Sequence, residues 1–142
     1  MLAADGDPEA IRFPRGMLDR TGDDRYAFSF SGLKTALALQ VRDKGGSAAL
    51  SETDRADLAN SYQEAIVDTL VARSCRAIES TGHARLVIAG GVGANRLLRE
   101  RAVALGVPVH IPPPELCTDN AAMIASAARY ADAVTFPHYL EL

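Results

Sequence analysis

The stretch that decides the fold reads R-L-V-I-A-G-G-V-G-A-N-R-L-L-R, at residues 85–99. Its first part, 85–89, begins a nearly continuous apolar run, which is typical of a strand covered on both faces. A glycine-rich turn follows at 90–93. The chain then takes on a helical pattern, so a helix is predicted over 94–105, closed by Gly106.

A second strand and a second helix are predicted directly after this unit. Residues 107–111 form another short strand, and Pro108 places it near the edge of its sheet. Prolines at 112–114 stiffen the next loop. An alanine-rich helix then runs to about Val134, and three residues offer caps for its start: Thr118, Asp119 and Asn120. The order strand, helix, strand, helix predicts a parallel α/β unit with helices packed on the sheet.

Further elements are predicted upstream of this unit. Aromatic and small residues alternate over 26–31, which indicates a short strand. Leu33, Leu37 and Val41 recur every four residues, which predicts an amphipathic helix to about Arg42. Glycines at 45 and 46 end this helix.

A long helix is predicted over 52–80. Ser51 and Asp54 have the spacing of a capping box, and Gly82 is suited to the stop. One side of this helix is expected to be buried, and its apolar residues are Leu58, Tyr62, Ile66, Leu70 and Ile78.

The composition is that of one globular domain. The chain has 142 residues, of which 48% are hydrophobic and 23% charged. We predict a linker-like irregular segment at 1–25, an α/β lobe at 26–136 and a tail at 137–142. The net charge of −3 argues against a stand-alone nucleic-acid binder, although one basic patch remains compatible with it.

The cysteines and the hydropathy indicate a cytoplasmic protein. Cys75 and Cys117 form neither a C-x-x-C pair nor a disulfide framework, so we expect a reduced, intracellular chain. No apolar run approaches the roughly 20 residues that span a bilayer. Residues 1–10 lack the pattern of a signal peptide.

The turn at 90–96 is the first candidate site. Glycines such as Gly90 and Gly91 let a ligand approach the backbone, and the first turn of a helix presents free N–H groups. The amide of Asn95 can donate and accept hydrogen bonds there. The pattern is neither a Walker A loop nor a dinucleotide fingerprint. The competing interpretation is a tight turn that only lets the helix pack on the strand.

The loop at 112–120 is the second candidate site. The carboxylate of Asp119 suits a metal ion, but the residues alone favour the interpretation that Asp119 or Thr118 simply caps the following helix. Cys117 is more typical of a small buried apolar residue than of a ligand. The histidines, at 83, 110 and 138, show no metal-ligand spacing, and catalytic metal sites usually need about three protein ligands. No residue stands out as a general base.

A third feature is the stretch at 29–35, S-F-S-G-L-K-T, which joins the short strand to the first helix. Lys34 could meet a phosphate there. The competing interpretation is an ordinary solvated charge.

Three separated motifs resemble the TsaD/Gcp family. They are F-S-F-S-G-L-K-T-A at 28–36, A-G-G-V-G-A-N-R-L-L-R at 89–99 and C-T-D-N-A-A-M-I-A at 117–125. The F-P-R of 13–15 and the G-D-P of 6–8 also fit. Each motif alone is weak, but together they cover nearly the whole chain in the right order.

The resemblance implies a two-lobe fold of the actin, Hsp70 and sugar-kinase type, with a nucleotide in the cleft. It implies transfer of threonylcarbamoyl from threonylcarbamoyl-AMP to the adenosine 3′ of the tRNA anticodon. Asp119 matches a ligand of the family's iron or zinc ion. Asn95 matches a contact to the adenylate, and Gly90 and Gly91 match the turn on its adenosine side. The implied partners are tRNA, a paralogous inactive subunit and a small ATPase.

The sequence also departs from the family pattern. The family's H-x-x-x-H pair of metal ligands does not occur in this sequence, so we expect a C-terminal fragment that is inactive alone. Two alternatives stay open, namely a lobe of an ATP-dependent kinase of the same superfamily and a non-catalytic module that docks partners. Nothing in the sequence supports a peptidase. Exposed lobe surface would favour self-association, which the sequence leaves open.

Overall fold

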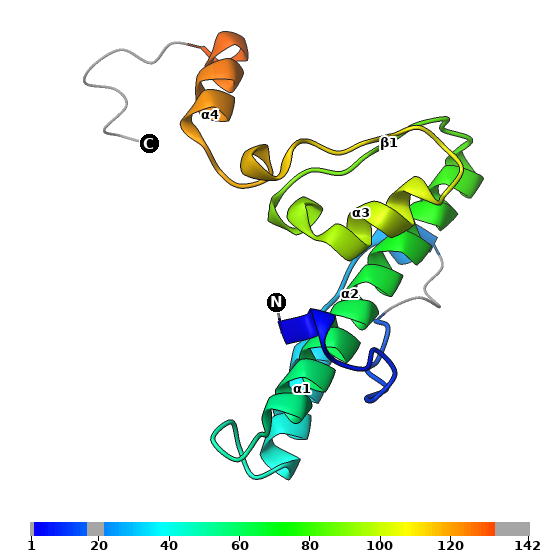
Figure 1. Ribbon diagram of the computed structural model, residues 1–142. Helices are drawn as coiled ribbons and strands as arrows, with labels where there is room; N and C mark the ends of the chain where they lie inside the picture. The colour runs from blue at the N-terminus through cyan, green and yellow to red at the C-terminus, as the bar shows by residue number, and fades with distance from the viewer. Residues whose placement is uncertain (1, 17–21, 133–142) are drawn as a thin grey trace.

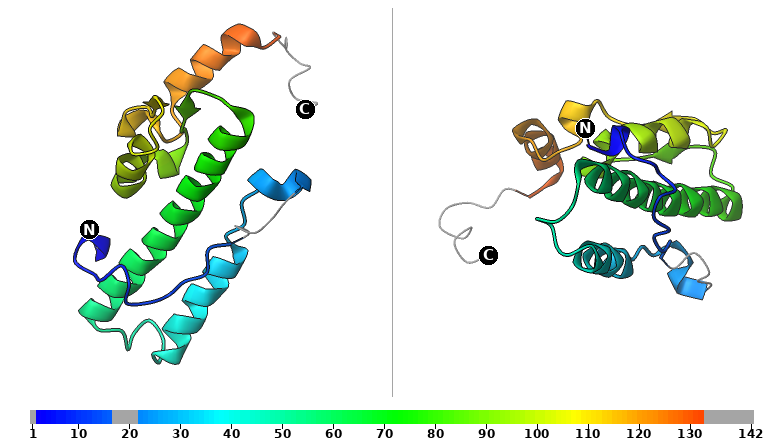
Figure 2. Two further views of the ribbon diagram at one scale, coloured as in Figure 1. Left: turned by 90° about the vertical axis from the view of Figure 1, so that its right-hand side faces the viewer. Right: turned by 60° about the horizontal axis from the view of Figure 1, so that its bottom comes forward.

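The computed structural model describes residues 2–16 and 22–132. Two helices, α1 (Ser31–Asp43) and α2 (Glu52–Thr81), lie side by side. On the other side of α2 lie α3 (Arg96–Val103) and a small parallel sheet (Figures 1 and 2). The architecture is therefore α/β, and α2 is the element to which the other parts attach.

The sheet has two short strands, β1 (Leu86–Val87) and β2 (Val109–His110). They run parallel, with Leu86 opposite Val109. Their ladder continues at Ile88, whose N–H donates to the carbonyl of His110 over 3.0 Å. Since α3 connects the two strands, the predicted order of strand, helix and parallel strand is confirmed.

The signals that end the helices are also confirmed. Ser51 and Asp54 form a reciprocal capping box at the start of α2, and Gly82 ends this helix in the left-handed conformation, with φ of 68°. Gly45 and Gly46, after α1, likewise have positive φ values of 88° and 90°. Glycine adopts such values without the steric cost that a side chain brings.

The N-terminal residues 2–16, here called the strap, run along α2. The N–H of Asp7 donates to Oδ1 of Asp57 over 2.7 Å. Oγ of Ser61 lies 3.1 Å from both the carbonyl of Asp7 and the N–H of Ile11, so it bonds the strap twice. The backbone of this segment is irregular, as its composition indicates, and it is bonded along its length to α2.

The main core lies between the strap, α1 and α2. Its buried apolar residues are Phe13, Leu33, Leu58 and Ala65. The rings of Phe13 and Tyr62 meet edge to face, with centroids 5.6 Å apart. On α2, Leu58 is buried as predicted, whereas the other apolar residues of the predicted side are only half-buried. Small and polar residues such as Ser61, Ala65 and Thr69 are buried instead.

An ionic cluster joins the strap and α3 to α2. Asp68 accepts hydrogen bonds from Arg15, at 2.7 Å, and from Arg101. Arg101 also donates to Glu64 over 2.7 Å. The strap and α3 are thereby bonded to the same turns of α2. Helix α3 directly follows the first candidate turn.

Three expectations about secondary structure are wrong. Residues 26–31 form no strand: a 3₁₀ turn ends at Tyr26, and the carbonyl of Phe30 accepts the first hydrogen bond of α1, from Lys34. The strand at 85–89 is not covered on both faces, since Val87 is 66% exposed. The last helix, α4 (Ala121–Ala127), continues only as a 3₁₀ turn to Tyr130, while Val134 lies outside the described residues.

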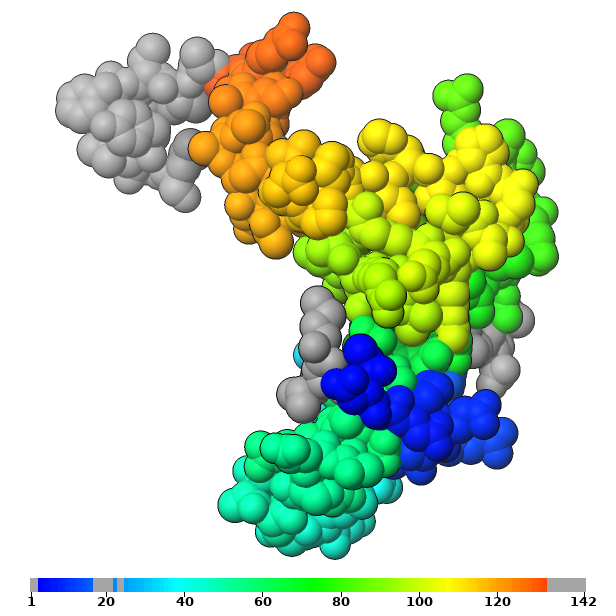
Figure 3. All heavy atoms as spheres, in the orientation of Figure 1, coloured from blue at the N-terminus to red at the C-terminus, as the bar shows by residue number. Residues whose placement is uncertain are grey.

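Helix α4 projects from the rest of the described residues (Figure 3). Every residue of α4 is exposed, and Figure 3 shows it standing away from the body that α2 and α3 form. No helix within residues 2–16 and 22–132 is long and apolar enough to cross a membrane. The predicted boundaries at 25 and 136 stay predictions.

The capping box makes the stability of α2 sensitive to acid. A hydrogen bond from Lys44, followed by those from Ser51, lowers the pKa of the Asp54 carboxyl from 3.8 to about 2. Because this pKa is depressed in the folded state, the ionised carboxylate adds stability that is complete above 3.8 and disappears as the pH falls to about 2. We expect Asp54→Asn to lower the Tm near neutral pH, and the difference from wild type to vanish in acid.

Thermal unfolding followed by circular dichroism across this range measures the effect. Glu52→Gln removes a negative charge from the same turn without altering the box, so it serves as the control. A Tm difference for Asp54→Asn that stays constant down to the lowest pH would contradict the assignment.

Candidate functional site

The first candidate turn joins β1 to α3. It contains a short 3₁₀ helix, Gly91–Ala94, and Gly90 precedes it with φ of 88° and ψ of 172°. Only glycine adopts these angles readily. A Cβ atom added to Gly90 or Gly91 would meet nothing within 4 Å, whereas at Gly93 it would contact Cys117, Ile88 and Ile111. Gly93 therefore lies in a packed region where a Cβ atom would make ordinary contacts, whereas Gly91 faces open space.

Asn95 is the N-cap of α3, one position before the first turn in which the sequence placed it. Its Oδ1 accepts from the N–H of Leu98 over 3.0 Å, and its Nδ2 donates to Oε1 of Gln63 over 2.9 Å. A primary amide has two donor hydrogens and two acceptor lone pairs. Among the described residues, these two bonds use one N–H and one lone pair of Asn95, so the other N–H and lone pair remain for a ligand, in an orientation fixed from α2.

A hollow of about 300 Å³ lies beside Asn95, between the strap, α2 and the start of α3. Its acidic side chains are paired: Glu64 with Arg101, and Glu100 with Arg96. The polar residues that line it are Asn60, Gln63, Glu64, Asn95, Arg96 and Glu100. Its amide groups match a ligand that both donates and accepts hydrogen bonds, such as a nucleobase or a ribose.

The second candidate turn follows β2. Cys117 is buried, as its chemistry predicted, and Asp119 is exposed. The cap of α4 is Asn120, whose Oδ1 accepts from the N–H of Met123 over 3.0 Å. Thr118 and Asp119 are therefore not the caps, and the carboxylate of Asp119 is not engaged in holding the helix.

The described residues do not assemble a metal site by themselves. Within residues 2–16 and 22–132, no three side chains of the His, Cys, Asp or Glu type gather in one place. His83 and His110 are exposed, and His138 lies outside the described residues. Asp119 thus offers one carboxylate, which is fewer than the three or so protein ligands of a catalytic centre. Lys34 is exposed on α1.

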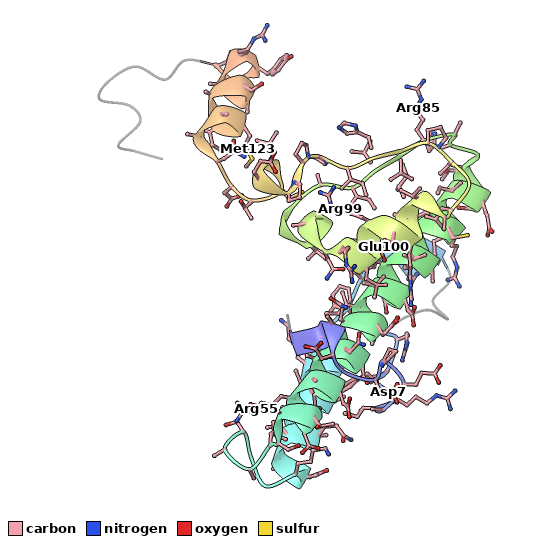
Figure 4. The ribbon with its side chains drawn as sticks, viewed as in Figure 1. Asp7, Arg55, Arg85, Arg99, Glu100 and Met123 are labelled. Carbon is pink, nitrogen blue, oxygen red and sulfur yellow. The ribbon has the colours of Figure 1, made fainter. Side chains whose placement is uncertain are left out.

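Sequence reasoning missed two residues of this region. Gln63 orients Asn95 from a distance of 32 positions along the chain, and no local pattern marks that pair. Arg99 bonds both candidate turns, to the carbonyls of Gly93 and Pro112 (Figure 4). Its position inside the 89–99 motif was the one available signal.

Both candidate turns follow strands that run in the same direction. Carboxyl ends of parallel strands meet at one edge of a sheet, which is where open α/β proteins bind ligands. The fold and the turns therefore define an α/β unit of the ligand-binding class. The chain belongs to the TsaD family, whose model, described as tRNA N6-adenosine threonylcarbamoyltransferase, matches residues 1–126.

Individual relatives agree with the family assignment. The tRNA N6-adenosine threonylcarbamoyltransferase of Magnetococcus marinus is 54% identical over 133 residues, which cover 89% of this chain and 35% of the relative. The protein of the same name from Bordetella petrii is 52% identical over 131 residues, covering 89% of this chain and 37% of the relative. The chain thus spans about a third of the length of these relatives.

Proposed function

We propose that this chain is the part of a tRNA N6-adenosine threonylcarbamoyltransferase that holds the adenylate end of the donor. The observation that carries the proposal is the pairing of the family match with an open, glycine-lined turn beside Asn95. The proposed donor is threonylcarbamoyl-AMP, and the acceptor is the adenosine 3′ of the tRNA anticodon. The surrounding fold is proposed to be two-lobed, with this chain forming one wall of the cleft.

Each residue of the first turn has a proposed part. Gly90 and Gly91 leave room for the adenosine to lie against the backbone, because a side chain at Gly91 would extend into the open space. The free N–H and lone pair of Asn95 would bond the nucleotide, with Gln63 keeping the amide in place. The reaction breaks the bond to AMP as the leaving group, and positioning of the two reactants supplies much of the rate.

Asp119 is proposed as one ligand of a divalent metal, iron or zinc, that would polarise the carbamoyl group when bound. The carboxylate is exposed and makes no hydrogen bond or ion pair with residues 2–16 or 22–132, which supports this assignment. The remaining ligands would have to come from outside the described residues, in keeping with the fraction of the relatives that the chain covers. The chain alone is therefore proposed to be inactive.

A chimera tests the proposed function. The matching third of the Magnetococcus marinus relative is replaced by this chain, and threonylcarbamoyl transfer to tRNA is measured. Transfer by a chimera that unfolds cooperatively on heating supports the proposal. A chimera that folds but transfers nothing, in both this relative and that of Bordetella petrii, overturns it. Phosphoryl transfer from ATP to a small acceptor would instead favour the kinase alternative.

Asn95→Asp in the chimera is expected to lower kcat/KM by roughly 10- to 100-fold. The aspartate keeps an oxygen for the cap of α3, but it loses both amide hydrogens and adds a negative charge beside a ligand that is itself an anion. Gln40→Glu, on α1, makes the same change from amide to carboxylate away from both turns and is expected to be neutral. Equal losses of kcat/KM in the two variants would show that Asn95 is not part of the site.

The binding partners and the cellular location are proposed from membership of the same family. The partners would be tRNA, a paralogous inactive subunit and a small ATPase, in the cytoplasm. A module that only docks partners is the competing function. In that case, Asn95→Asp and Asp119→Asn would leave the chimera's transfer activity unchanged.

A further inference from the structure

The two candidate turns are joined by one side chain, that of Arg99. Its Nε donates to the carbonyl of Gly93 over 2.6 Å, in the first turn. Its Nη2 donates to the carbonyl of Pro112 and to Sγ of Cys117, the latter over 3.3 Å, in the second turn. Figure 4 shows Arg99 in the space between α3 and the loop that follows β2. Arg99 thereby bonds both segments at once.

The contact between the two turns is also buried. Cys117 is 3% exposed, and its Sγ also lies 3.5 Å from the carbonyl of Pro112. A Cβ atom on Gly93 would sit 3.5 Å from the same sulfur, so Gly93 of the first turn and Cys117 of the second are close neighbours. Backbone carbonyls at a buried contact need donors, and the planar guanidinium of Arg99 supplies several in a fixed arrangement.

We infer that Arg99 is a positioning residue that sets the place of Asp119 relative to the Gly90–Gly91 turn. Asp119 follows Cys117 by two residues, and all of α4 beyond it is exposed. Arg99 therefore bonds Cys117, which is the last buried residue before Asp119. This inference rests on the proposed function, since the two turns would hold opposite ends of one donor. A ligand that spans both turns would depend on their spacing, whereas AMP alone would meet only the first.

The wild-type chain provides the first test, without any substitution. Arg96 lies on the same helix, is 84% exposed in its side chain and pairs only loosely with Glu100, at 3.8 Å. We expect the Nε–H of Arg99 to exchange with water about tenfold more slowly than that of Arg96, measured by NMR. Equal exchange rates would overturn the inference, because Arg99 would then not hold the first turn.

Arg99→Lys provides the second test. Lysine keeps a positive charge at this position, while the fork of donors is lost. In a Cys75→Ser background, we expect Cys117 to react with a thiol reagent about tenfold faster than in wild type. Arg96→Lys is the matched control and should leave the rate unchanged. No change in Arg99→Lys, or the same change in both variants, would contradict the inference.

The third test separates positioning from general stability. In the chimera, Arg99→Lys is expected to lower kcat by roughly 10- to 100-fold while AMP affinity stays within about twofold of wild type. An unchanged kcat, or equal losses in kcat and AMP affinity, would overturn the positioning role. If the chimera with wild-type Arg99 folds but is inactive, the proposed function fails instead, and the exchange and thiol rates still decide whether Arg99 couples the turns.

Discussion

Phe13→Ala is expected to lower the free energy of unfolding by about 3–5 kcal/mol. Phe13 is 2% exposed and lies in the core with Leu33, Leu58 and Ala65. Alanine would remove its edge-to-face contact with Tyr62 and leave a cavity between the strap and two helices. Single domains are stable by only about 5–15 kcal/mol, so this loss is a large fraction of the total.

Denaturant titration followed by circular dichroism measures the loss. Phe28→Ala is the matched control, because Phe28 is 49% exposed and truncation there leaves no buried cavity. We expect the control to lose at most about 1 kcal/mol. If both variants lost the same amount, Phe13 would not be the residue that anchors the strap.

Gly6→Ala is expected to detach the strap at a cost of about 2–5 kcal/mol. A Cβ atom on Gly6 would lie 2.1 Å from the carbonyl oxygen of Ala56. This oxygen belongs to the backbone of α2, which cannot yield without breaking its helix, so the strap must move. Two hydrogen bonds would then be strained or lost, from Asn60 to the carbonyl of Gly6 and from Asp7 to Asp57.

Two measurements detect the detachment. The denaturation midpoint falls, and trypsin cleaves faster after Arg15, whose side chain is paired with Asp68 in the folded chain. Gly32→Ala is the control, since a Cβ atom there meets nothing within 4 Å and alanine favours the helix. Its stability should stay level or rise by up to about 1 kcal/mol. Unchanged trypsin cleavage in Gly6→Ala would show that the strap stays docked.

Local signals in the sequence were sufficient to predict α1 and α2. Ser51, Asp54 and Gly82 act within a few residues of themselves, and the structure has α2 where they placed it. The coverage of β1 was mispredicted, because an apolar run does not reveal which layers are present to cover it. The docking of the strap was also missed, since it depends on contacts across about 50 positions rather than on a repeating pattern.

In the candidate site, too, the features with local signals were predicted and the long-range contacts were not. The two turns were found because glycines and a helix start mark them locally. The cap of α4 was left open among three adjacent residues, and backbone geometry selected Asn120. No role was predicted for Gln63 or Arg99. Gln63 bonds an amide on another element, and Arg99 bonds two backbone carbonyls. Neither kind of contact can be recognised from composition or periodicity.

The path of the strap also has a consequence for the order of folding. Contacts such as those of Asp7 with Asp57 and Arg15 with Asp68 join residues 50 and 53 positions apart. Synthesis at roughly 5–20 residues per second would separate the two sides of each contact by about 3–10 seconds. Closing so long a loop is also costly in entropy until its partner surface exists. The hairpin of α1 and α2 can form from nearer contacts, so we expect Phe13 to dock onto a hairpin that has already formed.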